Sequence, residues 1–200
     1  FTILLILKIR TNIACHYMRQ PRFYYTIFGS GGRETTVLRA DISKIYEDDK
    51  HVSVSQQFIP QLCCNMLDGT SDFLSISFDH CFIREIEECF SENVQHVSVS
   101  IKITNNRLTS IKRRTFRNLK LEQIFLYYNL IETLEDEAFF NLTSLCLVEL
   151  SNNRLKVVNP EAFSSLPNLT SLYLQHNHNS RVDSWGFQFL FGTCLHIAKL

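Results

Sequence analysis

The chain has 200 residues, a hydrophobic content of 45%, and 20 basic and 20 acidic residues. This composition is ordinary for a globular domain and is sufficient to build a hydrophobic core. Because the formal net charge is zero, composition gives no support for binding to nucleic acid or to an anionic membrane surface.

The N-terminal segment combines apolar and small residues in the order typical of a secretory signal. An apolar run extends from Phe1 to Ile9, and Arg10 and Ala14 follow it. We predict a truncated signal peptide over residues 1–14, with cleavage near Ala14. Lys8 interrupts the run, so a buried N-terminal strand is the alternative. We also expect the sequence to be a piece of a longer chain.

Residues 15–48 have a different character from the rest of the sequence. They contain Pro21, an aromatic cluster at 23–25 and a glycine-rich stretch at 29–32, without a repeating pattern. We predict an irregular N-terminal head, mostly loop, with apolar residues between 37 and 46 forming a cap. A repeat array needs such a cap because its terminal turn would otherwise expose apolar core.

Residues 49–200 repeat one pattern with a period in the twenties. Two independent markers keep that period, with spacings of 23, 24 and 24 residues in both series. The markers are Asn106, Asn129, Asn153 and Asn177, and Phe116, Phe139, Phe163 and Phe187. Apolar residues stand at fixed offsets between them. We predict six repeats starting near residues 49, 73, 98, 121, 145 and 169, with a partial seventh at 195.

Each position of the repeat has a physical reason. The apolar residues at offsets 3 and 5 alternate along a short strand, so both point into the core. The Asn at offset 8 carries two donors and an acceptor, so it can satisfy buried backbone groups of neighbouring turns, and stacked copies form a ladder. Cys81 takes this slot in the second repeat and Gln57 in the first. We therefore expect a looser ladder at that end and a Phe stack on the convex side.

The segment from Ser98 to Leu190 strongly resembles the typical extracellular leucine-rich repeat. The resemblance implies an α/β repeat fold: a curved solenoid with short parallel strands on its concave face and loops and short helical turns on its convex face. A weaker resemblance, carried by general layout, extends to secreted leucine-rich repeat proteins of arthropod immunity and to Toll-like ectodomains. Asn179 departs from the pattern, because Leu is expected there.

The strand positions that face away from the core predict a concave binding surface. Aromatic side chains gather there in the fourth to sixth repeats, flanked by one basic and one acidic residue. Exposed aromatic residues on a rigid surface are favourable anchors for a protein partner. The candidate partner-binding residues are Lys102, Phe125, Tyr127, Tyr128, Glu149 and Tyr173. The alternative is that these aromatic residues only cover their strand neighbours.

Cysteines and sequons favour an oxidising, extracellular setting. Seven cysteines are too many for an unremarkable cytosolic domain and cannot all pair within the chain. A disulfide between Cys63 or Cys64 and Cys89 is one option, and buried thiols are the other. Asn141 and Asn168 open Asn-Leu-Thr sequons, which are N-glycosylation acceptors in a secreted protein.

No set of residues predicts catalysis or a metal site. Asp79, His80 and Cys81 are adjacent, but His80 and Cys81 are expected to point in opposite directions. His176 and His178 lack a third ligand at a useful spacing. We therefore predict no enzyme activity, no cofactor and no metal.

The leading functional hypothesis is an extracellular module that binds a protein ligand or co-receptor through its concave face, in innate immune recognition. The alternatives are an ectodomain fragment of an adhesion or Toll-like receptor, and an intracellular repeat scaffold. We expect that the protein can form a homodimer or a heterodimer and that it has no nucleic-acid partner. We expect it to contact a membrane only through an anchor outside this sequence. The predicted localisation is secreted or extracellular, including the cell surface.

Overall fold

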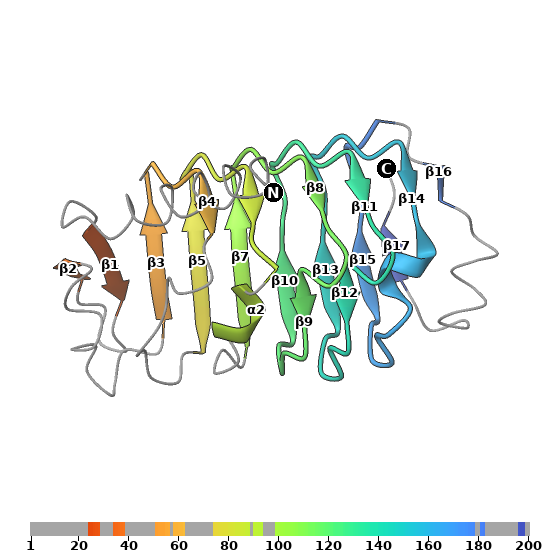
Figure 1. The fold of residues 1–200 in the computed structure, drawn as a ribbon, viewed down its shortest axis with the longest axis horizontal. Helices are drawn as coiled ribbons and strands as arrows, with labels where there is room; N and C mark the ends of the chain where they lie inside the picture. The colour runs from red at the N-terminus through yellow and green to blue at the C-terminus, as the bar shows by residue number, and fades with distance from the viewer. Residues whose placement is uncertain are drawn as a thin grey trace, which may run out of the picture.

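A computed structural model describes residues 24–28, 34–38, 51–56, 58–62, 74–88, 90–93, 99–178, 181–182 and 196–198. The chain winds as a solenoid in which strands of successive turns lie side by side along one face (Figure 1). This architecture confirms the predicted leucine-rich repeat solenoid. Residues 1–14, which carry the predicted signal peptide, lie outside the described residues.

One nine-stranded sheet forms the strand face, in the order β17-β15-β13-β10-β7-β5-β3-β1-β2. Neighbours from β3 to β17 pair in parallel. The parallel strands are β3 (His51–Ser55), β5 (Ser75–Asp79), β7 (Ser100–Thr104), β10 (Gln123–Phe125), β13 (Leu147–Glu149), β15 (Ser171–Tyr173) and β17 (His196–Ala198). The first six of these each begin two residues after an expected repeat start.

The N-terminal end of the sheet differs from the expected irregular head. Strands β1 (Tyr24–Phe28) and β2 (Glu34–Leu38) form an antiparallel hairpin, and β1 pairs antiparallel with β3. Part of the segment 15–48 is therefore strand rather than loop. The two strands are rich in aromatic and β-branched residues, which favour strand formation. The hairpin occupies the edge of β3 that would otherwise be unpaired.

The alternation along the strands builds the core as expected. In β5 and β7 the inward residues Ile76, Phe78, Ile101 and Ile103 are completely buried. The next turns place Ile124 with Leu126, Val148 with Leu150 and Leu172 with Leu174 at the same two positions, each at most 1% exposed. Each turn therefore contributes two inward side chains to one continuous core.

The side of the solenoid away from the sheet consists of short elements. They include two-residue parallel ladders in addition to the expected loops and short helical turns. The elements are β4 (Gln61–Leu62), β6 (Glu85–Ile86), α2 (Phe90–Asn93), β8 (Ser110–Ile111), β9 (Phe116–Arg117), β11 (Thr133–Leu134), β12 (Phe139–Phe140), β14 (Val157–Val158), η2 (Pro160–Phe163) and β16 (Arg181–Val182).

A stack of phenylalanine rings holds the convex side together, as the sequence predicts. Phe116, Phe139 and Phe163 are completely buried. The rings of Phe116 and Phe139 are 5.5 Å apart between centroids, and those of Phe139 and Phe163 are 5.3 Å apart, in stacked arrangements. The second repeat adds Phe90, also fully buried. Phe187 lies outside the described residues.

The asparagines at the strand ends join neighbouring turns by hydrogen bonds. The Oδ1 atom of Asn129 accepts from the backbone N–H of Leu108 in the preceding turn. Its Nδ2 donates to the carbonyl of Ile103 in that turn and to Leu126 in its own. The other ladder residues, Asn106, Asn153 and Asn177, make the equivalent bonds, each to the turn that precedes its own. Each amide therefore serves backbone groups that burial would otherwise leave unpaired.

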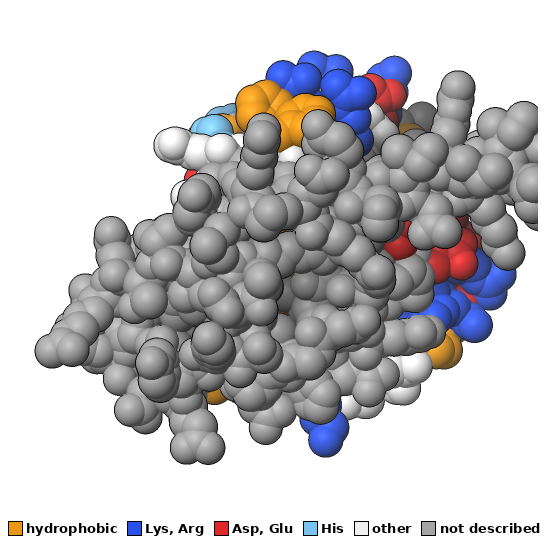
Figure 2. Space-filling view, turned by 60° about the vertical axis from the view of Figure 1, so that its left-hand side comes forward, with side chains coloured by type: hydrophobic (Ala, Val, Ile, Leu, Met, Phe, Trp, Pro, Cys, Tyr) orange, Lys and Arg blue, Asp and Glu red, His pale blue; other side chains and the backbone are white. Residues whose placement is uncertain are grey.

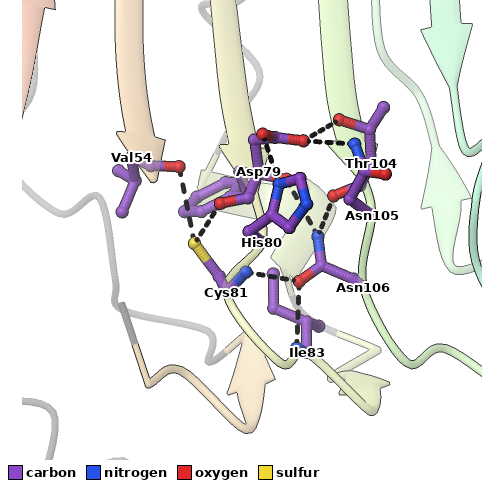
Figure 3. A network of polar contacts seen from close by, with 9 residues as sticks. Val54, Asp79, His80, Cys81, Ile83, Thr104, Asn105 and Asn106 are labelled. Atoms are coloured by element: carbon purple, nitrogen blue, oxygen red, sulfur yellow. Dashed lines mark hydrogen bonds and ion pairs between the residues drawn. The ribbon is translucent and has the colours of Figure 1, made fainter. Parts of the chain in front are cut away.

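Cys81 occupies the same slot with a weaker group. Its Sγ lies 3.4 Å from the carbonyl oxygen of Val54 and 3.3 Å from that of Asp79, the positions that the Asn106 amide serves one turn later (Figure 3). A thiol has one weak donor, whereas an amide has two donors and an acceptor. The backbone N–H of Ile59 bonds instead to the carbonyl of Cys81.

Replacing ladder residues should therefore have unequal costs. We expect Asn129→Ala to lower the free energy of unfolding by about 3 kcal/mol, because it leaves buried N–H and carbonyl groups unpaired, and Cys81→Ala to lower it by about 1 kcal/mol. Urea unfolding monitored by circular dichroism measures both. Lys120→Ala, at an exposed position, is the control. Equal losses for Asn129→Ala and Cys81→Ala would contradict this view of the ladder.

Candidate functional site

One row of residues crosses the exposed face of the sheet at a single register. Lys102 pairs with Phe125, Phe125 with Glu149, and Glu149 with Tyr173, on β7, β10, β13 and β15 respectively. Their neighbours along each strand point into the core, so these four side chains project outward. The sheet therefore presents a basic, an aromatic, an acidic and a second aromatic side chain in sequence.

Three aromatic residues of the fourth repeat form a contiguous cluster on this face. The rings of Phe125 and Tyr127 meet edge to face at 6.4 Å, and those of Tyr127 and Tyr128 at 5.7 Å. Lys102 Nζ lies 5.2 Å from the centre of the Phe125 ring, a cation–π contact. Phe125 and Tyr127 are half-buried, and Tyr128 is 54% exposed. We call Lys102, Phe125, Tyr127 and Tyr128 the aromatic cluster.

The structure separates Tyr173 from this cluster. Glu149 lies between Tyr173 and Phe125 in the row, and no ring contact among the described residues joins Tyr173 to the other aromatic side chains. The Glu149 carboxylate accepts a hydrogen bond of 2.9 Å from the backbone N–H of Ser151. The six residues singled out from sequence thus form a cluster of four, a fixed carboxylate and a separate tyrosine.

Tyr128 occupies a special backbone position at the end of its strand. It has a φ of 54°, in the left-handed region. The residue before the ladder position has a similar φ in the other turns, at Gln56, His80, Asn105, Asn152 and His176. A left-handed residue there ends the strand and redirects the chain, so that the next side chain turns inward. Asn tolerates this region better than an aromatic residue does, so Tyr128 adopts the turn of the repeat at a conformational cost.

A second polar group lies at the ends of β5 and β7, as Figure 3 shows. The Asp79 carboxylate accepts from Thr104 Oγ1 at 2.7 Å and from Asn105 Nδ2 at 2.8 Å, and it lies 2.7 Å from His80 Nδ1. Partial burial acts to raise the pKa of Asp79, but the hydrogen bonds from Asn105, His80 and Thr104 outweigh it. The net effect lowers the pKa of this carboxyl below its ordinary value of 3.8.

The neighbouring His80 and Cys81 do not form a nucleophile–base pair. The imidazole of His80 is exposed and bonds to Asp79, whereas Cys81 is completely buried and its thiol faces backbone carbonyls. Within the described ranges, no group of three or more His, Cys, Asp or Glu side chains is arranged to hold a metal ion. The same ranges contain no helix with the length and apolar character needed to cross a bilayer.

The remaining predicted sites fall in different places. Asn141 and Asn168 are both exposed, and their Nδ2 atoms donate to Asn118 Oδ1 at 2.9 Å and to the Thr143 carbonyl at 2.6 Å. The proposed disulfide residues Cys63, Cys64 and Cys89 lie outside the described residues. Cys146 is a free, half-buried thiol that contacts the Glu122 carbonyl.

Three basic residues on the convex side pair with carboxylates in adjacent turns. Glu137 bonds to Arg113 and Arg114 at 2.8 and 2.9 Å, and Lys112 pairs with Glu85. Hydrogen bonding to Arg113 dominates the environment of Glu137, and the pKa of its carboxyl is lowered. These exposed ion pairs join turns of the solenoid and leave little unpaired charge for a ligand.

Sequence reasoning missed an exposed group of residues beside the sheet. Phe58, Phe82 and Arg107 each follow the ladder slot by one residue in successive turns. Phe58 is 64% and Phe82 41% exposed, and the Arg107 guanidinium lies 4.8 Å from the centre of the Phe82 ring. Aligning the repeats one residue beyond the ladder slot reveals this pattern, because Phe58, Phe82 and Arg107 then fall in one column.

Comparisons with known proteins agree with this geometry. A family model for the leucine rich repeat matches residues 99–145 and 120–178. Leucine-rich repeat-containing protein 3 of Danio rerio is 32% identical over 110 residues, which are 54% of this chain and 41% of that protein. This chain therefore spans less than half the length of that relative.

Two solved receptor structures resemble the fold. The chain of a TLR13–ssRNA13 complex superimposes with a TM-score of 0.59 at 27% identity, covering 62% of this chain and 18% of that one. The Toll–Spatzle complex of Drosophila gives a TM-score of 0.66 at 20% identity, covering 74% of this chain and 20% of that one. Fold, repeat spacing and family model together show that residues 99–178 are leucine-rich repeats.

The Asp79 group makes a pH-dependent contribution to stability. Because the folded state holds the pKa of Asp79 below its ordinary value, the stabilisation is complete at pH values above about 5 and declines as pH falls through the lowered value. We expect the difference in free energy of unfolding between the wild-type chain and Asp79→Asn to shrink between pH 6 and pH 3, values chosen to bracket that range. Urea titrations at each pH measure it.

The control for this experiment is Glu122→Gln, at an exposed position whose carboxylate has no hydrogen bond among the described residues. Its difference from the wild-type chain at each pH is the reference against which the Asp79→Asn difference is compared. A constant difference for Asp79→Asn would show that the three hydrogen bonds do not favour the ionised carboxylate.

Proposed function

We propose that this chain is an extracellular module that binds a protein ligand or co-receptor through the aromatic cluster on its sheet face. The observation that carries the proposal is the contact of Phe125, Tyr127 and Tyr128 with one another and with Lys102. Tyrosine offers a large, rigid contact area with a polar tip, and it is enriched among the residues that contribute most to binding.

The scaffold beneath the cluster supports this role. Lys102 lies on β7 and Phe125 on β10, and Tyr127 and Tyr128 directly follow β10. The inward residues of both strands are fully buried, and Asn106 and Asn129 hold the chain where the strands end. A surface that is rigid before binding loses little conformational entropy when a partner docks. In addition, the Phe125 and Tyr127 rings are already in contact, so docking need not order them separately.

Charge makes one orientation of the partner favourable. Lys102 and Glu149 stand on opposite sides of Phe125 in the same row, so the cluster has a basic and an acidic flank. A complementary partner would present an acidic group over Lys102 and a donor over Glu149. Such flanking charges contribute to association rate and specificity more than to affinity.

The Toll–Spatzle complex of Drosophila, in which a chain of the same architecture forms a complex, supports a protein ligand for this fold. That likeness carries the fold alone. The innate immune role that we propose for this chain rests on the layout of its sequence, which resembles secreted leucine-rich repeat proteins of arthropod immunity.

The test of the concave site uses single substitutions. We expect Tyr127→Ala to weaken binding of an extracellular partner by roughly 30-fold or more, because it removes the centre of the cluster. Tyr173→Ala should weaken it less, because Tyr173 lies beyond Glu149. The partner can be obtained by photo-crosslinking from a residue placed at position 125, and surface plasmon resonance then measures each variant.

The matched control is Val157→Ala, which changes a 59% exposed apolar residue on β14, outside the nine-stranded sheet. Circular dichroism should show that all variants keep the fold. Unchanged affinity in Tyr127→Ala, or equal losses in Tyr127→Ala and Val157→Ala, would rule out the aromatic cluster as the binding site.

Glycosylation tests the extracellular part of the proposal. Asn141 and Asn168 are exposed, and neither belongs to the aromatic cluster, so a sugar on each is compatible with the fold. We expect the chain, when directed through a eukaryotic secretory pathway, to carry glycans at Asn141 and Asn168. Asn141→Gln and Asn168→Gln should each remove one glycan, which intact-mass spectrometry detects. A secreted chain unmodified at both sites would contradict this prediction.

A further inference from the structure

A groove lies beside the sheet at the ends of β3, β5 and β7. It has a volume of about 480 Å³. The residues that line it are Gln56, His80, Phe82, Asn105, Asn106 and Arg107. Four of them, Gln56, His80, Phe82 and Asn105, have left-handed φ values between 52° and 60°. We call this feature the rim groove.

An aromatic ridge forms one side of the rim groove. The rings of Phe58 and Phe82 are 6.1 Å apart between centroids, and the two side chains are 64% and 41% exposed. In Figure 2, exposed hydrophobic side chains lie directly beside Lys and Arg side chains and close to a histidine at one edge of the molecule. Two adjacent exposed phenylalanines are an unfavourable arrangement in water unless something covers them.

Arg107 supplies an unused cation next to this ridge. Its guanidinium stacks over the Phe82 ring at 4.8 Å, and its backbone N–H bonds to the Ile83 carbonyl. Among the described residues, no hydrogen bond or ion pair engages the guanidinium itself. Its planar set of donors is therefore held by the ring and available to an acceptor. Asp79, on the strand that leads to the groove, is already engaged by three donors.

We propose that the rim groove binds a peptide segment of a partner protein in which a carboxylate stands next to an aromatic or aliphatic side chain. The carboxylate pairs with the two outward N–H groups of Arg107, and the apolar side chain covers Phe82 and Phe58. The exposed amide of Gln56 lies in the same hollow and can bond to the peptide backbone. This site adjoins the aromatic cluster, because the backbone N–H groups of Asn105 and Asn106 bond to the carbonyls of Tyr127 and Tyr128, but the two sites share no residue.

The charge of the groove favours a protein over a nucleic acid. Single-stranded nucleic acids need a series of cations along their backbone as well as stacking platforms. The groove has one unengaged cation, Arg107, and its histidine is hydrogen-bonded to the Asp79 carboxylate. A peptide with one carboxylate beside an apolar side chain is complementary to the groove, because Arg107 can pair with the carboxylate and Phe82 and Phe58 can contact the apolar side chain.

Capped hexapeptides with a central Glu-Phe pair, and matched peptides with Gln-Phe, test the proposal on the full chain. Amide chemical shifts measured by NMR report both affinity and location. We expect the Glu-Phe peptide to bind roughly tenfold more tightly than the Gln-Phe peptide, with shifts around Phe82 and Arg107. Arg107→Gln should remove that preference, and Phe82→Ala should weaken both peptides.

Arg154→Gln is the matched control, because Arg154 is exposed and follows Asn153 as Arg107 follows Asn106. It should leave the preference for Glu-Phe intact. Equal binding of the two peptides, no saturable shift at the groove, or equal losses in the two arginine variants would overturn the proposal. Tighter binding of a single-stranded RNA oligonucleotide at these residues would also overturn it, as would a dimer of the chain that Arg107→Gln dissociates.

Discussion

The hydrogen bonds of the buried asparagines are the constraint on which the rest of this structure depends. In every turn of a solenoid the chain bends at the end of its strand and continues around the core. The backbone groups at that bend are removed from water but have no partner in the sheet. Asn106, Asn129 and Asn153 supply both donors and an acceptor at this point, within a side chain that is at most 6% exposed. The period of the sequence is therefore the distance between successive corners that need the same amide.

This constraint separates the residues that make the fold from those that face a partner. The ladder and the stack of Phe116, Phe139 and Phe163 fix each turn from two opposite sides. The outward side chains of the strands belong neither to the ladder nor to the phenylalanine stack. These positions can therefore be Lys102, Phe125 or Glu149 without a change in the fold. A repeat fold can thus keep one architecture while its surface varies, which is why the family identifies the fold more closely than the ligand.

The sequence was sufficient to predict the solenoid, the strand positions and the inward and outward faces, because each follows from a local period. It was less informative where the structure depends on contacts between different turns. The hairpin of β1 and β2 has no repeat signature, and its residues were read as a loose head. The repeat offset placed Phe125, Glu149 and Tyr173 in one row, but the ring contacts that leave Tyr173 outside the aromatic cluster depend on side-chain packing that the period does not encode. Phe82 and Arg107 belong to different turns, and their stacking is a contact that spacing alone does not show.

The turn that has Cys81 in its ladder slot also carries the side-chain network centred on Asp79. Cys81 offers one weak donor where its neighbours offer an amide, so the corner between β5 and the preceding turn is held less firmly. On the other side of the same corner, Asp79 bonds to Thr104 and Asn105 and ties β5 to β7. The same bond holds Asn105, and the backbone of Asn105 shapes the rim groove next to Arg107. Cys81, the departure from the repeat consensus, is therefore close to Asp79, whose carboxylate holds the residues that shape the rim groove.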